Sequence, residues 1–139
     1  MNQPTPIQNN MFNRTVVQEA LKRSLKFDSR KTVSPIETPE SQSTVISQLI
    51  HDIFGGEILK THKGKKWHFY NRINGERIDF TMSELAKSPE ENSFEDISSN
   101  PDETLNYFEQ EDYSTIFMRF VMAFEEIVGL KKYQSGYTA

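Results

Sequence analysis

Three residues of this chain have the types and order that covalent chemistry on a carbonyl group requires: Ser43, His68 and Asp79. In such a site a histidine takes the proton of a nucleophile, and a carboxylate orients the histidine. Ser43 is expected in the first turn of a helix, where the helix dipole favours negative charge. That position suits a thiolate far better than a hydroxyl. The chain contains no cysteine, so its activity depends on the residue at position 43.

The strand pairing near His68 follows from Asn74-Gly75, a dipeptide preferred in two-residue type I′ turns. The predicted pairs are Ile73 with Glu76, Arg72 with Arg77, Asn71 with Ile78, Tyr70 with Asp79, and His68 with Thr81. Paired residues share a face of the sheet, as do alternate residues along one strand. His68 and Tyr70 should therefore share a face with Asp79, whose carboxylate lies diagonally within reach of the imidazole.

Periodicity predicts the elements that position these residues. Apolar spacing indicates helices from Thr15 or Asn13 to Leu25, from about Gln42 to the Gly55-Gly56 stop, and from Pro101 or Glu111 to Val128, ending at Gly129. Strands are expected at 57–61, 66–73 and 76–81, a helical turn at 83–86, and exposed loops at 28–40 and 88–101. The fold class is α+β: a flexible N-terminus (1–12), one domain (13–130) and a flexible tail (131–139).

Composition limits the classes of function. The net charge of −4 argues against nucleic-acid binding, because phosphate-binding surfaces carry a basic excess. The basic cluster at 60–66 is interpreted as a solvated hairpin. No apolar run approaches the ~18 residues of a membrane span, and residues 1–6 lack the core of a signal peptide. We expect a cytoplasmic protein without a cofactor, a metal site or a membrane partner, since no metal-ligand spacing or phosphate-binding loop is found.

Each candidate residue also has an ordinary structural interpretation. Ser43 can cap a helix, because Ser and Thr crowd this segment. His68 can be a structural strand histidine, and Asp79 a surface charge near a turn. Composition and spacing alone therefore make the three residues together only a weak signal of chemistry.

The joined motifs resemble the small bacterial YunG-like family. Its pattern runs Gly-Gln-Cys, an apolar helix, Phe-Gly-Gly-Glu-Ile-Leu, then His-Tyr/Phe-Tyr-Asn-Arg, Gly and Asp-Phe-Thr. The matching residues here are Gln42, Phe54 to Leu59, His68, Tyr70, Asn71, Arg72, Gly75, Asp79, Phe80 and Thr81. The resemblance covers roughly residues 14–129. The family's glycine is Ser41 here and its cysteine is Ser43, and the second departure puts thiol catalysis by this chain in doubt.

The Cys-His-Asp order is also similar to that of transglutaminase-like and NlpC/P60 thiol hydrolases. The resemblance implies a papain-like fold and a hydrolase or transferase acting on amide, isopeptide or thioester bonds. His68 would be the general base and Asp79 its orienting carboxylate. The backbone N–H of residue 43, with the Gln42 side chain, would hold the oxyanion. Asn71 and Tyr70 would support the site.

Three classes of function stay open. The first is this thiol enzyme in a form made inactive by Ser43. The second is a non-catalytic pseudoenzyme or binding module that holds a protein or peptide in the same cleft, which the lack of cysteine favours. The third is a purely structural protein. The intact residues from Trp67 to Thr81 favour an engineered change to Ser43, and a natural serine homologue is the alternative.

Overall fold

The computed structural model describes residues 12–25, 38–80 and 94–134. The helices are α1 (Arg14–Leu25), α2 (Pro39–Phe54), α3 (Pro101–Thr104) and α4 (Gln110–Gln134), with a 3-10 turn, η3 (Leu105–Tyr107). The strands are β1 (Glu57–Lys63), β2 (Lys66–Ile73), β3 (Glu76–Ile78) and β4 (Ile97–Ser99). The predicted α+β class is confirmed.

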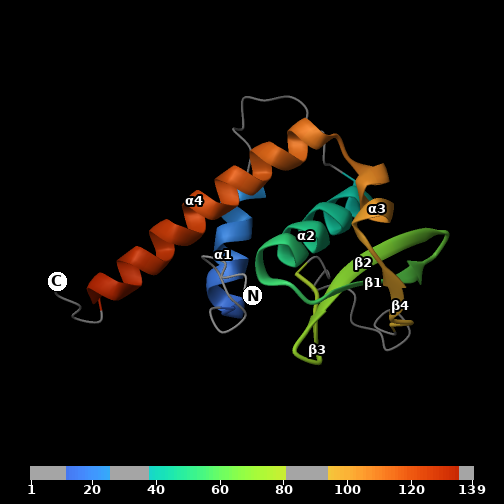
Figure 1. Ribbon diagram of the computed structural model, residues 1–139, viewed down its shortest axis with the longest axis horizontal. Helices are drawn as coiled ribbons and strands as arrows, with labels where there is room; N and C mark the ends of the chain where they lie inside the picture. The colour runs from blue at the N-terminus through green and yellow to red at the C-terminus, as the bar shows by residue number, and fades with distance from the viewer. Residues whose placement is uncertain (1–11, 26–37, 81–93, 135–139) are drawn as a thin grey trace, which may run out of the picture.

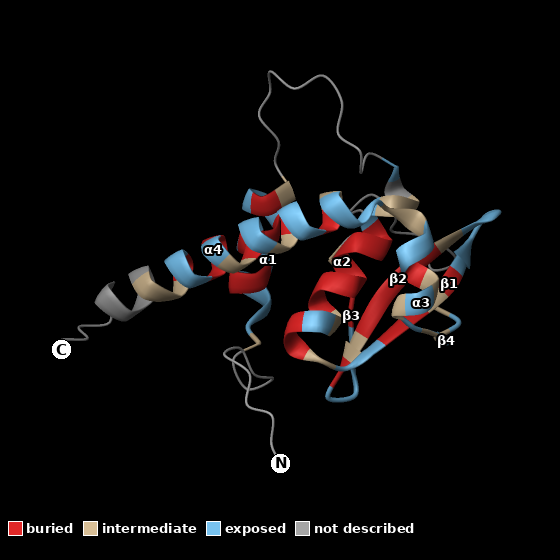
Figure 2. Cartoon of the chain, turned by 45° about the horizontal axis from the view of Figure 1, so that its top comes forward, coloured by how far each residue is buried: buried red, intermediate tan, exposed pale blue. Residues whose placement is uncertain are grey.

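The elements form three layers, with α2 in the middle (Figure 1). On one side of α2, α4 runs across the molecule and packs against α1. On the other side lies an antiparallel sheet with the strand order β3-β2-β1-β4. A helix between two layers is buried around most of its circumference. Every residue of α2 from Ser43 to Ile50 is buried (Figure 2). The polar ones among them make side-chain hydrogen bonds: Ser43, Thr44, Ser47 and Gln48.

The hydrophobic core joins α2 to the two other long helices. Phe54, at the end of α2, makes edge-on ring contacts with Phe120 and Phe124 of α4, at centroid distances of 6.4 and 5.8 Å. Phe12 packs against the same ring at 5.1 Å. Aromatic pairs of this geometry add about 0.5–1.5 kcal/mol each to the burial of their area.

A partly buried polar network also ties α2 to α4 and α3. The carboxylate of Asp52 accepts hydrogen bonds from Gln48 Nε2 at 3.0 Å and from Tyr113 Oη at 2.5 Å. Gln48 in turn accepts from the hydroxyl of Thr104 in α3. Burial and the neighbouring Asp52 carboxylate raise the pKa of Tyr113, so its hydroxyl stays a hydrogen-bond donor at physiological pH.

The start of α2 lies three residues before the predicted position. Thr38 is the N-cap, and its hydroxyl accepts from Ser41 N at 3.1 Å. Pro39 follows at the first helical position, where its missing N–H costs nothing. The prediction assigned Pro39 and Glu40 to the preceding loop, because the apolar stripe of this helix begins only at Val45. The cap, rather than the stripe, fixes where the helix begins.

The predicted hairpin register is confirmed from Asn71–Ile78 to Ile73–Glu76, with Asn74 and Gly75 both at positive φ as a type I′ turn requires. β3 ends at Ile78 instead of continuing to Thr81. β1 extends to Lys63, two residues past its predicted end, because the turn is tighter than expected. The three-residue strand β4 pairs with β1 inside a segment predicted as loop, and a strand so short leaves no readable alternation.

Gly129 does not end the last helix. α4 continues to Gln134, so its predicted end is wrong. Of the two predicted starts, Glu111 lies one residue from the observed start at Gln110. Pro101 begins α3 and Gln110 begins α4, with η3 between them. A glycine stops a helix only where the chain adopts the left-handed conformation, and Gly129 remains helical. The turn predicted at 83–86 and most of both predicted flexible termini lie outside the described residues.

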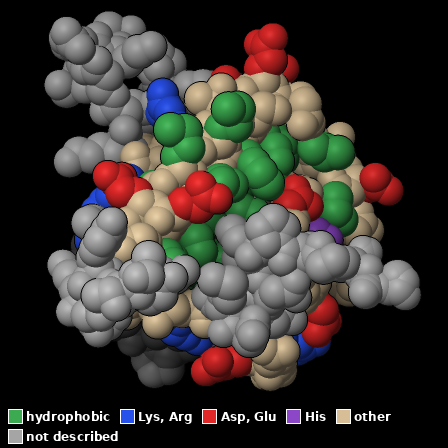
Figure 3. Space-filling view, turned by 60° about the vertical axis from the view of Figure 1, so that its left-hand side comes forward, with side chains coloured by type: hydrophobic (Ala, Val, Ile, Leu, Met, Phe, Trp, Pro, Cys, Tyr) green, Lys and Arg blue, Asp and Glu red, His purple; other side chains and the backbone are tan. Residues whose placement is uncertain are grey.

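The surface of the described part carries scattered apolar side chains. One face shows hydrophobic side chains interspersed with Asp and Glu (Figure 3). Met118 and Met122 of α4 are among the most exposed large apolar residues. Single exposed apolar side chains are common on folded proteins. Within the ranges described, no helix is apolar over a stretch long enough to span a bilayer.

Candidate functional site

His68 and Asp79 form a nearly buried pair. The Nε2 atom of His68 lies 2.6 Å from Oδ2 of Asp79, and their side chains are only 10% and 8% exposed. Asp79 directly follows β3, so the hairpin brings its carboxylate beside the histidine of β2, as the register predicts. Contact with Asp79 through Nε2 leaves Nδ1 as the ring nitrogen nearer to the backbone of β2.

The pair lies on the face of the sheet that is turned away from α2. The Asn71 side chain donates to Ser47 O of α2 at 2.9 Å, so the face of β2 that carries Asn71 is turned toward α2. His68 and Tyr70 alternate with Asn71 and point to the other face. There Tyr70 packs against Phe94, with ring centroids 4.8 Å apart, and the segment before β4 covers them.

Ser43 lies at the edge of β2. It is fully buried, and its hydroxyl donates to Glu40 O at 2.9 Å and accepts from Phe69 N at 3.1 Å. The Glu40 carboxylate accepts from Trp67 N at 2.9 Å. Both amides belong to the part of β2 that extends beyond its pairing with β3. The start of α2 therefore takes the place of a neighbouring strand along this edge. Ser43 was predicted in the first turn of this helix, but α2 begins at Pro39, so Ser43 is its fifth residue and lies just beyond that turn.

The structure thus joins two of the three predicted catalytic residues directly. Ser43 meets the same strand through the amide of Phe69, the residue after His68, and its hydrogen bonds go to backbone groups. A proton passing from position 43 to His68 would have to cross the edge of β2. Direct contact between Ser43 and His68 stays a prediction.

The three supporting residues have different environments. Gln42 is exposed at the start of α2. Asn71 is buried and links β2 to α2 through Ser47. Tyr70 donates to Asp96 Oδ1 and accepts from Asp96 N, both at 2.8 Å, and its ring lies 6.1 Å from that of His68. Burial and the hydrogen bond to Asp96 raise the pKa of Tyr70, which keeps its hydroxyl protonated.

Two residues of this region were missed by the sequence interpretation. Glu40 pairs the start of α2 with Trp67, and Asp96 holds Tyr70 and Arg77 together. Glu40 could have been noticed, because an acidic residue two positions after a Thr-Pro start belongs to the first turn of a helix. Asp96 gives no local signal, since its partners are 19 and 26 positions away.

Asp96 should make the stability of the fold depend on pH in the acid range. The hydrogen bond from Arg77 (Nη2 to Oδ2, 2.8 Å) is the main reason that the pKa of Asp96 lies below its ordinary 3.8. A carboxylate with a lowered folded pKa stabilises the fold above its unfolded pKa, and this contribution is lost as pH falls through the folded pKa. Between about pH 5 and about pH 3, the melting temperature of Asp96→Asn should therefore fall less than that of the unchanged chain.

The control for this measurement is Asp102→Asn, which removes an exposed carboxylate in α3. Its melting temperature should follow the unchanged chain over the same pH range. Identical acid dependence of Asp96→Asn and Asp102→Asn would show that the Arg77 contact does not stabilise the fold.

Comparison with known proteins identifies the family. The model of the family described as YunG protein matches residues 13–125. The chain belongs to the YunG family. Over 72 residues it is 42% identical to a relative from Bacillus subtilis (strain 168) named "Uncharacterized protein YunG". The predicted YunG-like resemblance is confirmed.

The match to this YunG relative spans 52% of the chain and 60% of the relative, which is less than two thirds of the relative's length. No solved structure matches the chain. The papain-like fold and the catalytic arrangement therefore stay predictions.

Proposed function

We propose that this chain is the serine form of a papain-like thiol hydrolase or transferase that acts on amide, isopeptide or thioester bonds. The observation that carries the proposal is the buried His68–Asp79 pair next to the strand edge where α2 begins. A histidine and a carboxylate in such contact are the proton-transfer half of a nucleophilic site. The nucleophile position is the other half, and the start of α2 brings it to the edge of the strand that carries His68.

With cysteine at position 43, the reaction would proceed in two steps. The sulfur attacks the carbonyl carbon, His68 takes the thiol proton and then gives it to the leaving amine or thiol, and an acyl-enzyme forms. Water or another acceptor then loses a proton to His68 and attacks the acyl carbon, which releases the thiol. Asp79 orients the imidazole, and the Gln42 side chain holds the oxyanion. The backbone N–H of residue 43, predicted to share this role, lies inside α2, where it belongs to the helical hydrogen bonds.

With serine at position 43, turnover should be negligible. A hydroxyl is a much weaker acid than a thiol, so the helix start and His68 cannot ionise it to a useful extent. The Ser43 hydroxyl also hydrogen-bonds two backbone groups, which holds it in the ground state. The site would then still bind substrate without cleaving it.

The alternative is a pseudoenzyme or binding module that uses the same cleft for a protein or peptide. The burial of Ser43 favours it, because the side chain has no exposed surface and closes the edge of β2. In that case Ser43 is a structural residue, and the His68–Asp79 pair stabilises the hairpin.

An acyl-transfer assay separates the two functions. Ser43→Cys is incubated with p-nitrophenyl acetate or a simple thioester and examined by intact mass spectrometry. We expect one acetyl group on Cys at position 43 and a rapid release of p-nitrophenol, because a thiolate beside a base attacks activated esters. The chain with Ser43 should remain unmodified.

Ser47→Cys is the matched control. Ser47 lies one turn further along α2, is also buried, and has no predicted role in the site. His68→Ala in the Ser43→Cys background should abolish the acetyl adduct without removing the thiol. If Ser43→Cys and Ser47→Cys are equally inert although both are folded, the enzyme proposal is wrong and the binding module is favoured.

A further inference from the structure

A hollow of about 260 Å³ lies between α1, the start of α2 and the residues that follow β3. Its apolar wall is formed by Leu21 and Leu25 of α1, Ile46 of α2, and Phe80. Pockets for drug-sized ligands begin at about 300 Å³, so this one suits a smaller group, such as an aliphatic side chain or short acyl chain.

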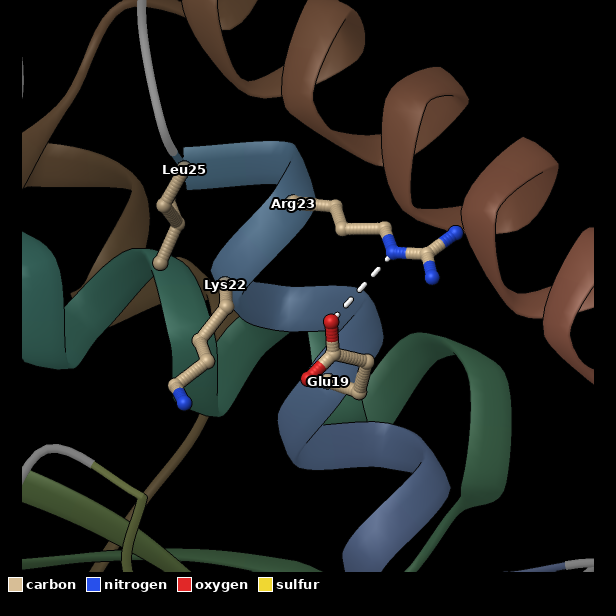
Figure 4. Close-up of a pocket in the computed structure, with 4 residues that line it drawn as sticks. All are labelled: Glu19, Lys22, Arg23 and Leu25. Atoms are coloured by element: carbon tan, nitrogen blue, oxygen red, sulfur yellow. Dashed lines mark hydrogen bonds and ion pairs between the residues drawn. The ribbon is translucent and has the colours of Figure 1, made fainter.

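Lys22 gives this hollow a positive charge. Figure 4 is a close-up of a neighbouring pocket, which shares Lys22 and Leu25 with this hollow, and it shows these two side chains on one side of α1, whereas Arg23 reaches toward α4. Arg23 is neutralised by Glu19 and Glu126, at 3.4 and 3.3 Å. Lys22 lines the hollow and makes no ion pair with any residue in the described ranges. An apolar wall with one unpaired cation at its rim is complementary to an aliphatic group that carries an anion.

The hollow adjoins the candidate site at the start of α2. Gln42 lines it and is the residue before Ser43. Phe80, the residue after Asp79, also lines it and packs against the core on the α2 side, opposite the His68–Asp79 pair. A ligand in the hollow would therefore lie next to the start of α2. This is where the non-reacting part of a substrate would have to bind to orient its carbonyl.

We propose that this hollow binds an aliphatic carboxylate, which is the recognition element of the substrate. The proposal rests on the proposed function only in calling the ligand a substrate, because binding of the carboxylate requires no reaction. The aliphatic chain packs against Leu21, Leu25 and Phe80, and the carboxylate contacts the ammonium group of Lys22. Such a group occurs in short fatty acids and in a peptide that ends in an aliphatic residue.

The test is an NMR titration of the chain as it stands, read from the amides of α1 and the first turns of α2. Hexanoate represents the fatty acid, and N-acetyl-leucine represents the end of a peptide. The one that binds more tightly identifies the source of the carboxylate. Hexanoate should bind about fivefold tighter than its neutral analogue hexanamide, as expected for one exposed charge pair. It should bind about tenfold tighter than butyrate, because two more methylene groups are buried.

Lys22→Gln should abolish the preference for hexanoate over hexanamide and leave hexanamide binding unchanged. Lys65→Gln is the control, because it makes the same charge change at an exposed residue in the β1–β2 turn. Absence of shifts in α1 and α2 with both carboxylates, or an equal loss in the two lysine variants, would overturn the proposal.

Failure of this proposal is separable from failure of the proposed function. If Ser43→Cys forms the acetyl adduct but neither carboxylate binds, the hollow is not the recognition site and the enzyme proposal stands. If carboxylates bind in the Lys22-dependent way but Ser43→Cys is inert, the hollow is a ligand site of the binding module.

Discussion

Gly56→Ala should destabilise the protein by about 3–5 kcal/mol, the sum of a strained backbone and a steric clash. Gly56 has a φ of +84°, a region that residues with a side chain rarely adopt. A Cβ atom there would lie 2.6 Å from the carbonyl oxygen of Arg72 and 3.0 Å from Cγ1 of Ile73. The backbones of Gly56 and Arg72 cannot move apart without shifting the first residues of β1 relative to β2. Urea-induced unfolding, followed by circular dichroism, measures the loss.

Gly64→Ala and Gly75→Ala are the matched controls for this prediction. Both glycines have positive φ, at +66° and +81°, but no atom lies within 4 Å of a Cβ built at either position. Each should cost only the strain of the left-handed conformation, about 1–2 kcal/mol. If Gly56→Ala unfolds at the same urea concentration as the two controls, the close approach to Arg72 does not limit stability.

Ser43→Cys should create a thiol that reacts with iodoacetamide about 100-fold faster than Ser47→Cys at pH 6, where an ordinary thiol is almost entirely protonated. Both positions are buried in α2, but position 43 lies four residues closer to the helix start, and its side chain contacts the amide of Phe69, the residue after His68. The helix start and a protonated imidazole both stabilise a thiolate. The rates are measured by quenching and intact mass spectrometry.

The contribution of the histidine is tested in the same background. His68→Ala should slow alkylation of Ser43→Cys by about tenfold or more, because the thiolate loses its counter-charge. Asp79→Asn should slow it less, since the imidazole remains but loses its orientation. Equal rates for Ser43→Cys with and without His68 would exclude an ion pair between the two residues and leave the binding module as the better explanation.

The hairpin and its neighbours were predictable because their signals are local. Asn74-Gly75 fixes the turn type, and the turn fixes the register that brings Asp79 to His68. Gly55-Gly56 likewise marks the end of α2. These features depend on residues close to one another in the sequence.

Other features depend on contacts that a single sequence does not reveal. β4 exists because Ile97 to Ser99 can pair with β1 more than thirty positions earlier, and its three residues carry no period of their own. The position of Ser43 at the edge of β2, in contact with the amide of Phe69, follows from how α2 docks on the sheet. The packing between layers decides how a helix docks, and the periodicity of the sequence does not determine the orientation of that helix.

The contacts of Glu40 and Ser43 with β2 should also limit the aggregation of this protein. An exposed strand edge is a template for pairing with another chain, and it promotes aggregation. Here both outer strands have only three residues, so the longer β2 would otherwise present bare amides at Trp67 and Phe69. The side chains of Glu40 and Ser43, near the start of α2, accept hydrogen bonds from these amides. The residues that fix α2 against β2 therefore also cover an edge that could pair with a second molecule.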